Sequence, residues 1–146
     1  MRLRIGYPDR ESERQIVRQA ASEDLRLSPV LTAHEVVELQ RAVTKVSVDS
    51  ALVDYMLAIV DRTRAHENLT LGVSPRGAQA LYRASQAMAA LDGRDFVLPD
   101  DIKQLAVPVF AHRIVMASRF GLENRSSLET AELVIADILT EIEVPL

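Results

Sequence analysis

The stretch Gly72-Val73-Ser74-Pro75-Arg76-Gly77 contains the start of a helix and places one arginine in its first turn. Ser74 can cap free backbone N–H groups, Pro75 suits the first helical position, and Gly72 allows the incoming backbone to turn sharply. Because helix N-termini favour anions, a guanidinium held there can contact a phosphate. The stretch therefore predicts a helix from residue 75 with a candidate anion contact at Arg76. The same residues also fit a purely structural helix cap.

Apolar residues at helical spacing predict three helices before this stretch. Asp9 can cap the first of them, which carries Ile16, Val17 and Ala20 on one face and ends before Ser28-Pro29. Thr32-Ala33-His34-Glu35 is a capping-box pattern that begins the second. The third follows Asp49, and its apolar positions are Leu52, Tyr55, Met56, Ile59 and Val60. We expect the second and third helices to form an αα-hairpin.

Three further helices and one small β element are predicted after residue 72. The helix that starts at Pro75 should end at Asp92-Gly93, with Ala78, Leu81, Ala84, Met88 and Leu91 as its inward stripe. Pro99-Asp100 opens the next helix, in which Pro108 predicts a kink or a break. The last helix covers residues 128–142, after a polar connector at 118–127. Residues 96–98 and 114–116 are expected to pair as short strands.

The composition agrees with an all-α fold. The chain has 146 residues, 48% of them hydrophobic and only 4% aromatic, so a core would consist of aliphatic side chains between helices. Five glycines and six prolines are too few for the turns of a small β-sandwich. We therefore expect a bundle of five or six helices, with room for a small two-stranded β element.

Charge and cysteine content exclude several functional classes. A net charge of −4 argues against a dedicated nucleic-acid binder, which would display a basic face. The absence of cysteine excludes disulfides, thiolate metal sites and thiol nucleophiles. No segment has the apolar length of a signal peptide core or of a membrane span. The sequence is typical of a soluble, cytoplasmic protein.

Motifs for independent catalysis are missing from the sequence. No segment matches Gly-x-x-x-x-Gly-Lys-Ser/Thr, the loop that cradles nucleotide phosphates, so the chain is not a P-loop ATPase by itself. No serine lies in a Gly-x-Ser-x-Gly elbow. His34, His66 and His112 lie far apart and lack the spacing of metal ligands, so no metal site is expected.

Four motifs in order resemble one family. They are Arg4-Ile5-Gly6-Tyr7-Pro8-Asp9, the stretch at residues 72–77, Val97-Leu98-Pro99-Asp100-Asp101-Ile102, and His112-Arg113, followed by a last helix that runs into Val144-Pro145. This arrangement resembles the C-terminal lid of a MoxR-type AAA+ ATPase, and the resemblance covers nearly the whole chain. Gly77 is a slight departure, because this family usually has alanine there.

The resemblance implies a division of the chain and a set of site residues. Residues 1–8 would be a connector from a P-loop core, and residues 9–146 a helical lid with a C-terminal tail. Arg76 would be sensor 2, the arginine that reaches the γ-phosphate of ATP on the core. Gly6, Tyr7 and Pro8 would lie close to the adenine, although a plain linker turn explains them equally well. His112 and Arg113 would make a structural polar contact within the lid.

The resemblance also implies cofactors and partners. The intact protein would bind ATP and Mg²⁺ and hydrolyse ATP, whereas this fragment alone would hold neither and be inactive. Its partners would be the P-loop core, other copies in a homo-oligomeric ring (a hexamer), and protein substrates that it remodels as a chaperone, some with von Willebrand factor A domains. No nucleic acid or membrane span is expected.

Two other functions remain open from the residues alone. In one, the chain is a free-standing helical interaction module, and the residues at 74–76 are only a cap. In the other, a helix-turn-helix-like spacing serves DNA binding, against which the acidic balance counts. Arg62 and Arg64 could face a nucleotide or a neighbouring subunit, or could simply lie at a solvated helix end.

Overall fold

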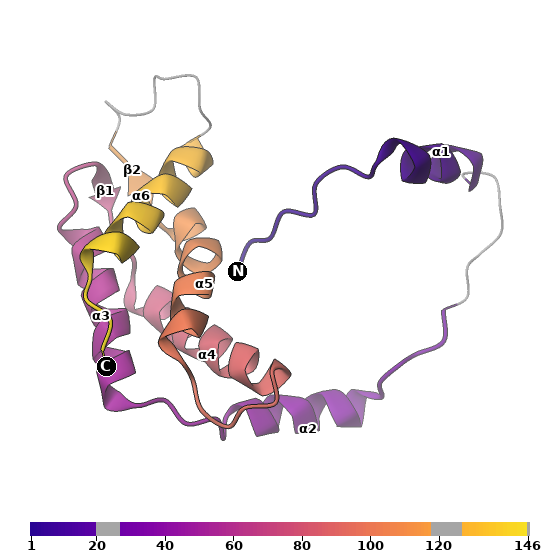
Figure 1. The fold of residues 1–146 in the computed structure, drawn as a ribbon, viewed down its shortest axis with the longest axis horizontal. Coiled ribbons are helices and arrows are strands. Elements are labelled where there is room, and N and C mark those ends of the chain that lie inside the picture. Colours follow the sequence, from indigo (N-terminus) through magenta and orange to yellow (C-terminus); the bar gives the residue numbers. More distant parts are fainter. Residues whose placement is uncertain (20–26, 118–126, 146) are drawn as a thin grey trace.

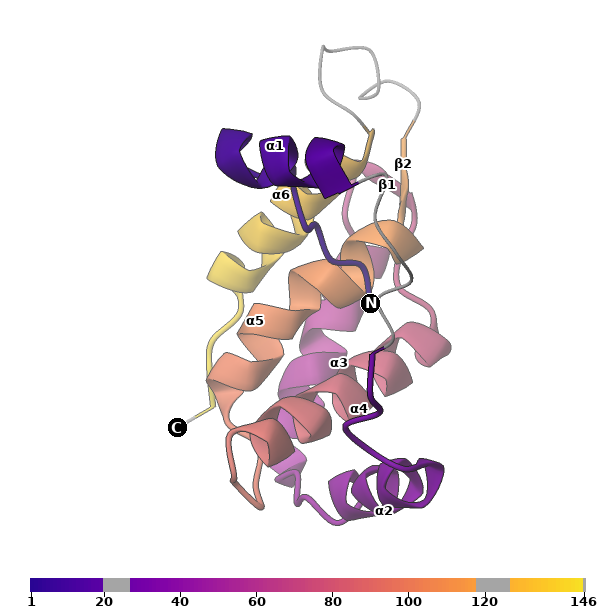
Figure 2. The same cartoon turned by 90° about the vertical axis from the view of Figure 1, so that its right-hand side faces the viewer.

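Four helices form the centre of the computed structural model, which describes residues 1–19, 27–117 and 127–145 (Figure 1). These helices are α3 (Ser50–Arg64), α4 (Pro75–Leu91), α5 (Pro99–Phe110) and α6 (Ser127–Glu141). Both α4 and α6 pack against α3 and α5. Figure 2 shows α5 lying between α4 and α6. With α1 and α2, the described ranges hold six α-helices. The expected all-α bundle is confirmed.

Local capping signals set the starts of these helices. Asp49 accepts a backbone N–H at 2.8 Å at the start of α3. Pro75 and Pro99 occupy the beginning of α4 and α5, where a missing N–H costs nothing. The Asp101 carboxylate reaches back to the N–H of Leu98 at 2.8 Å. Because a cap acts on N–H groups no more than three residues away, the sequence could predict these starts.

The apolar pattern on α3 is confirmed, and the stripe expected on α4 is confirmed except at Leu91, because Leu81 is buried and Ala78, Ala84 and Met88 pack against the core. All five apolar positions predicted on α3 are buried. On α4, Leu91 is 85% exposed, and the buried residues include Ser85 and Gln86. The Gln86 side-chain amide donates to the Val46 carbonyl at 2.7 Å, which satisfies a polar group in the core. Since α4 touches α2, α3 and α5, its buried surface is wider than one stripe.

A small antiparallel β element is present, but one of its strands differs from the prediction. Strand β2 (Val115–Met116) pairs with β1 (Leu69–Leu71), not with residues 96–98. Phe96 instead forms an isolated parallel bridge with Ser47. The short runs at 69–71 and 96–98 both contain apolar residues, and β2 pairs with the first of them, which follows α3 in the chain and packs against it.

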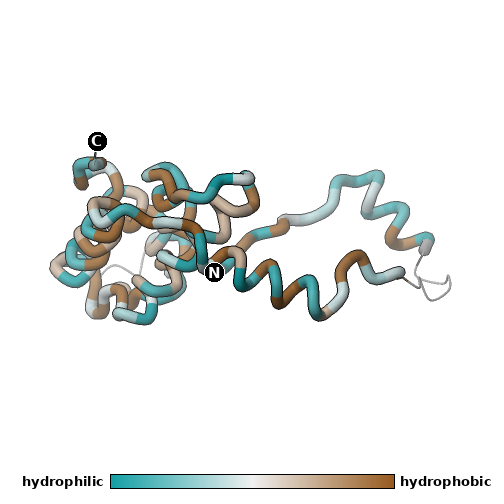
Figure 3. Tube along the Cα trace, turned by 90° about the horizontal axis from the view of Figure 1, so that it is seen from below, coloured by the Kyte–Doolittle hydropathy of each residue, from teal (hydrophilic) through white to brown (hydrophobic). Residues whose placement is uncertain are grey.

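Two helices precede the bundle on an extended part of the chain, α1 (Arg10–Gln19) and α2 (Ala33–Val43). Their predicted caps are confirmed, because Asp9 accepts the N–H of Ser12 at 2.7 Å and Thr32 forms the capping box with Glu35. Ala20, expected on the face of the first helix, lies outside the described residues. Figure 3 shows this part of the chain projecting from the bundle with apolar residues along it.

The expected αα-hairpin between α2 and α3 does not form. Helix α2 packs against α4 instead. The N–H of Ser47 donates to Asp95 O at 2.8 Å, and Val97 N–H donates to Ser47 O at 3.0 Å. These bonds attach the α2–α3 connection to the α4–α5 connection. Helix α2 therefore does not run antiparallel alongside α3.

Pro108 lies inside α5 without breaking it. The helix continues to Phe110 and then tightens into the 3₁₀ segment η1 (Ala111–Arg113). The Pro108 carbonyl accepts a hydrogen bond from the N–H of Arg2 at 2.8 Å, and the Arg4 guanidinium donates to both Glu132 carboxylate oxygens at 3.0 and 3.1 Å. The extended start of the chain is thereby attached to α5 and α6.

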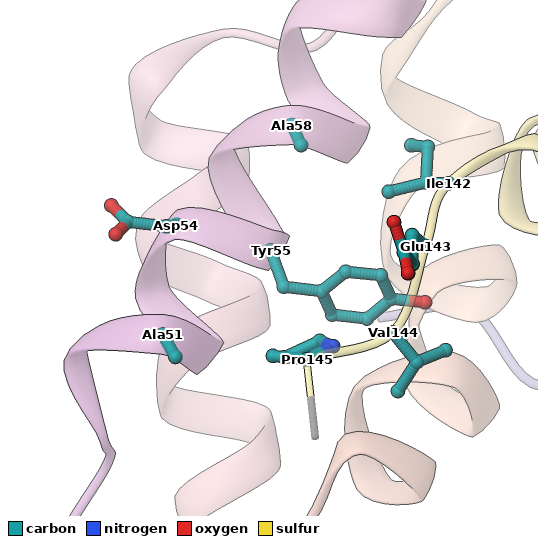
Figure 4. A pocket seen from close by; sticks show the side chains of 8 residues that line it. All are labelled: Ala51, Asp54, Tyr55, Ala58, Ile142, Glu143, Val144 and Pro145. Atoms are coloured by element: carbon teal, nitrogen blue, oxygen red, sulfur yellow. The ribbon is translucent and has the colours of Figure 1, made fainter.

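The C-terminal residues Ile142–Pro145 pack over the side chain of Tyr55 (Figure 4). Together with residues of α3 they line a pocket of about 410 Å³. Tyr55 is 3% exposed, and its hydroxyl has no hydrogen-bond partner in the described part of the chain. Burial, and secondarily the negative charge of Asp100, raise the pKa of Tyr55.

We expect Tyr55→Phe to raise the free energy of unfolding by about 1 kcal/mol, because it removes a buried polar group that lacks a partner and keeps the ring. Urea unfolding of both chains measures the difference. A loss of stability in the phenylalanine variant would show that the hydroxyl has a stabilising contact and would contradict this expectation.

Candidate functional site at the start of helix α4

The loop between α3 and α4 is held tightly to the end of α3. A Cβ atom on Gly72 would lie 2.7 Å from the backbone of Arg64, so only glycine allows this approach. The N–H of Val73 donates to the buried Thr63 hydroxyl at 3.0 Å, and Arg64 Nε donates to the Val73 carbonyl at 3.0 Å. These contacts fix the position of Ser74, where α4 begins.

The start of α4 leaves Arg76 free to bind a ligand. The Ser74 hydroxyl accepts the N–H of Gly77 at 3.3 Å, which confirms the predicted cap. Pro75 has no N–H, and the N–H of Arg76 has no partner within the helix. The Arg76 side chain is exposed and makes no hydrogen bond or ion pair with any residue in the described ranges. A cation and a free N–H therefore lie together at a helix N-terminus.

Gly77 is buried for a packing reason. An added Cβ would lie 2.5 Å from Cγ1 of Val73, which is itself 1% exposed. Valine is stiff at χ1, so it cannot easily move aside. The departure from alanine at position 77 thus has a packing reason, because a residue without a Cβ allows the close approach of Val73.

We expect Gly77→Ala to lower the free energy of unfolding by about 1 kcal/mol. Overpacking costs typically about 1–3 kcal/mol, which exceeds the gain of up to about 1 kcal/mol in helix propensity. Urea unfolding of both chains measures the balance. A stabilised alanine variant would show that Val73 moves without cost.

Arg113 lies close to the same helix start. Its Cδ atom is 3.6 Å from the position that a Cβ on Gly77 would occupy. Its Nε atom is buried without a hydrogen-bond partner in the described part of the chain. The expected structural polar contact of Arg113 within the lid is therefore not seen among these residues. The sequence analysis missed its approach to Gly77, because the two residues are 36 positions apart.

Positive charges also lie around His112, next to Arg113 in the chain. Partial burial lowers the pKa of His112, and the charges of the chain's amino terminus, Arg113 and Arg2 lower it further. This pattern shows that Arg2 and Arg113 both lie near the imidazole at the end of α5.

Arg62 and Arg64, by contrast, have partners within the chain. Arg62 Nε lies 2.7 Å from a Glu141 carboxylate oxygen and so joins α3 to α6. Arg64 contacts Asp61 at 3.1 Å as well as the Val73 carbonyl. Their positions support the structure around the helix start.

The structure does not bring Gly6, Tyr7 and Pro8 into contact with Arg76. All three are exposed, and Tyr7 is as accessible as in an extended peptide, at 101%. Gly6 has φ +76°, a conformation that favours glycine, so the chain turns there after the attached residues Arg2 and Arg4. The chain is thus extended at residues 6–8, and the side chains of Tyr7 and Pro8 are exposed.

The histidines do not form a metal site within the described ranges. His66 Nδ1 accepts the N–H of Asn68 at 3.2 Å, and His34 lies 3.9 Å from Glu38. No group of histidine and acidic residues there could hold a metal ion. No helix in those ranges has the length and apolar content needed to cross a bilayer.

Comparison with known proteins identifies the family. A family model described as the AAA lid domain matches residues 61–137, more than half of the chain. The chain is 37% identical over 146 residues to the uncharacterized protein YeaC of Bacillus subtilis, covering 99% of this chain and 44% of YeaC. It is 28% identical over 153 residues to the chaperone MoxR1 of Mycobacterium tuberculosis, covering 99% of this chain and 40% of MoxR1.

A solved structure agrees with these relatives. A crystal structure of a candidate ATPase from Cytophaga hutchinsonii superposes with a TM-score of 0.83 at 27% identity, over 97% of this chain and 45% of that protein. The chain spans less than half the length of each of these three relatives. The family match shows that the chain belongs to the AAA lid domain family, and the similarity to MoxR1 and the shared fold agree with this.

Proposed function

We propose that this lid completes the ATP site of a P-loop core and that Arg76 binds the γ-phosphate as sensor 2. The observation that carries the proposal is the exposed Arg76 side chain, without a protein partner in the described ranges, in the first turn of a 17-residue helix. A planar guanidinium can donate two parallel hydrogen bonds to phosphate oxygens. The helix N-terminus favours the same negative charge.

The residues at this helix start fit a nucleotide phosphate, whereas they do not fit Mg²⁺. The site has cationic donors and a free N–H, and the described residues offer no cluster of carboxylates for a metal. When bound, ATP with Mg²⁺ supplies the reactive phosphoanhydride, and the core would supply the metal ligands. In this chain, Arg76 would bind and orient the terminal phosphate.

The division of the chain follows from the same proposal. Residues 1–8 would connect the core to a lid at 9–146, with Gly6, Tyr7 and Pro8 near the adenine. The exposed apolar side chains of α1 and α2 support this division, because Ile16, Val17 and Leu39 are each more than half exposed. Such faces are expected to be covered by another domain.

Lid movement would couple ATP hydrolysis to work on other proteins. With Arg76 attached to the γ-phosphate, lid and core would be held together, and hydrolysis would release them for a rigid-body rotation. The relative MoxR1 is named a chaperone, which supports remodelling of protein substrates by a homo-oligomeric ring. We propose a hexamer that acts on partners with von Willebrand factor A domains.

The test is ATP turnover by the full-length protein that carries this chain, before and after Arg76→Ala. Loss of turnover with an intact fold supports the proposal. Unchanged turnover contradicts it and favours the free-standing interaction module, in which the residues around Ser74 are only a cap.

A further inference from the structure

The residues that precede α4 return to the end of α3 and are bonded to it. The chain leaves α3 at Arg64, passes through β1 and comes back at Gly72 against the backbone of residues 63 and 64. The next residue, Val73, is 1% exposed and directly precedes the N-cap Ser74. A shift of the start of α4 relative to α3 would therefore have to disrupt the contacts of Val73.

The side chain of Thr63 makes the first of these contacts. Its hydroxyl donates to the Val60 carbonyl at 2.6 Å and accepts the N–H of Val73 at 3.0 Å. Thr63 is 0% exposed, so no solvent molecule can take its place. A bond from a helical threonine to a carbonyl of its own helix is common. Valine would fill almost the same space, so packing alone does not require the hydroxyl, whereas the Val73 N–H does.

Arg64 makes the second contact with Val73. Its Nε atom donates to the Val73 carbonyl at 3.0 Å, and its terminal nitrogen Nη1 donates to Asp61 at 3.1 Å, which orients the guanidinium. Both backbone polar groups of Val73 are thus bonded to consecutive residues at the end of α3. The backbone is held on both sides of Val73, three residues before Arg76.

We propose that Thr63, together with Arg64, is a positioning residue for Arg76. By fixing Val73, the pair sets where the first turn of α4 lies and so where the Arg76 guanidinium meets the terminal phosphate. The inference rests on the function proposed above. Arg76 itself makes no hydrogen bond or ion pair in the described ranges, so its backbone determines its place. A misplacement of about 1 Å can lower a rate about 10²-fold.

The experiment measures ATP turnover by the full-length protein with Thr63 changed to valine or to serine. Thr63→Val keeps the shape and leaves the buried N–H of Val73 without an acceptor. We expect kcat to fall about tenfold or more, but no further than in Arg76→Ala, because displacement cannot cost more than loss of the side chain. Thr63→Ser keeps the hydroxyl and should retain most of the turnover. Affinity for ADP with Mg²⁺ should stay nearly unchanged, since ADP lacks the γ-phosphate.

The same substitution in the Arg76→Ala protein shows whether Thr63 acts through Arg76. If it does, Thr63→Val should lower turnover of the natural protein and cause no further loss once Arg76 is absent, because residues that act as a unit are not additive. A merely structural role would lower turnover by the same factor in both backgrounds.

Asp101→Asn is the control for lost stability. Asp101 is buried, and its hydrogen bonds to Arg94 and Leu98 lie at the α4–α5 connection. This variant should keep the natural turnover at a temperature where thermal unfolding shows every chain to be folded. If Thr63→Val does not fold, Arg64→Lys carries the test, because it keeps the charge and loses the Nε donor to Val73.

The outcomes distinguish this inference from the proposed function. If Arg76→Ala lowers turnover while Thr63→Val and Arg64→Lys leave it unaltered, the positioning role is refuted and the sensor role of Arg76 stands. If Arg76→Ala leaves turnover unchanged, the proposed function fails and the inference fails with it. Equal losses from Thr63→Val with and without Arg76 would assign Thr63 a general structural role and overturn the inference.

Discussion

Replacing Arg76 by alanine in the full-length protein is expected to lower ATP turnover about 100-fold while the lid stays folded. Removing one preorganised donor to charge that develops in a transition state costs about 10²–10³ in rate. The side chain is exposed and makes no hydrogen bond or ion pair with the described residues, so its loss should change the free energy of unfolding by no more than about 0.5 kcal/mol. Steady-state phosphate release and urea unfolding measure the two quantities.

Two further variants show whether the effect of Arg76→Ala is specific. Arg76→Lys keeps the charge without the planar fork, so turnover should recover only in part. Arg83→Ala, on the same helix but two turns away from its start, should turn over ATP at the unaltered rate. Equal losses in Arg76→Ala and Arg83→Ala would indicate a general electrostatic effect and contradict a specific phosphate contact.

The Asp101→Asn substitution is expected to lower the free energy of unfolding by about 2–3 kcal/mol at neutral pH, because it removes one partner of a largely buried ion pair. Asp101 is 5% exposed. Its carboxylate accepts hydrogen bonds from both terminal nitrogens of Arg94, at 2.7 and 2.8 Å, and from the Leu98 N–H at 2.8 Å. Arg94 also donates to the Phe96 carbonyl at 3.0 Å, so the pair holds the α4–α5 connection in place.

The effect of Asp101 should depend on pH. Burial alone would raise the pKa of Asp101, but the hydrogen bonds from Arg94 and Leu98 and the charge of Arg94 outweigh burial and hold that pKa below its ordinary value of 3.8. A carboxyl with a lowered folded-state pKa stabilises the fold above its unfolded pKa, and this contribution is lost as the pH falls through the folded pKa. The natural chain should therefore lose more stability than Asp101→Asn between neutral pH and pH values below about 4.

Asp92→Asn is the control for Asp101→Asn. Asp92 also contacts Arg94, at 2.9 Å, but its side chain is 57% exposed. Exposed pairs contribute about 0–1 kcal/mol, so this variant should unfold almost like the natural chain. Urea unfolding at several pH values measures all three chains. Equal stabilities for Asp101→Asn and Asp92→Asn would contradict the role assigned to the buried pair.

Much of the site can be predicted from sequence because its signals are local. The cap at Ser74 and the position of Arg76 depend on residues within one helical turn. The cap that Asp101 forms at the start of α5 is likewise local, since its carboxylate accepts the Leu98 N–H. Its ion pair with Arg94 could not be read in the same way, because a seven-residue separation has no fixed geometry across a turn.

The sequence by itself determined where the helices begin, which of them carries an exposed arginine in its first turn, and which family the motif order resembles. Only the tertiary structure decided that β2 pairs with β1, that Gln86 is buried on α4, and that Arg113 reaches the turn containing Gly77. The physical reason is the separation along the chain between the residues that interact. Caps and helical periodicity act over a few residues, whereas strand pairing, the buried face of α4 and the approach of Arg113 to Gly77 depend on packing between elements distant in sequence.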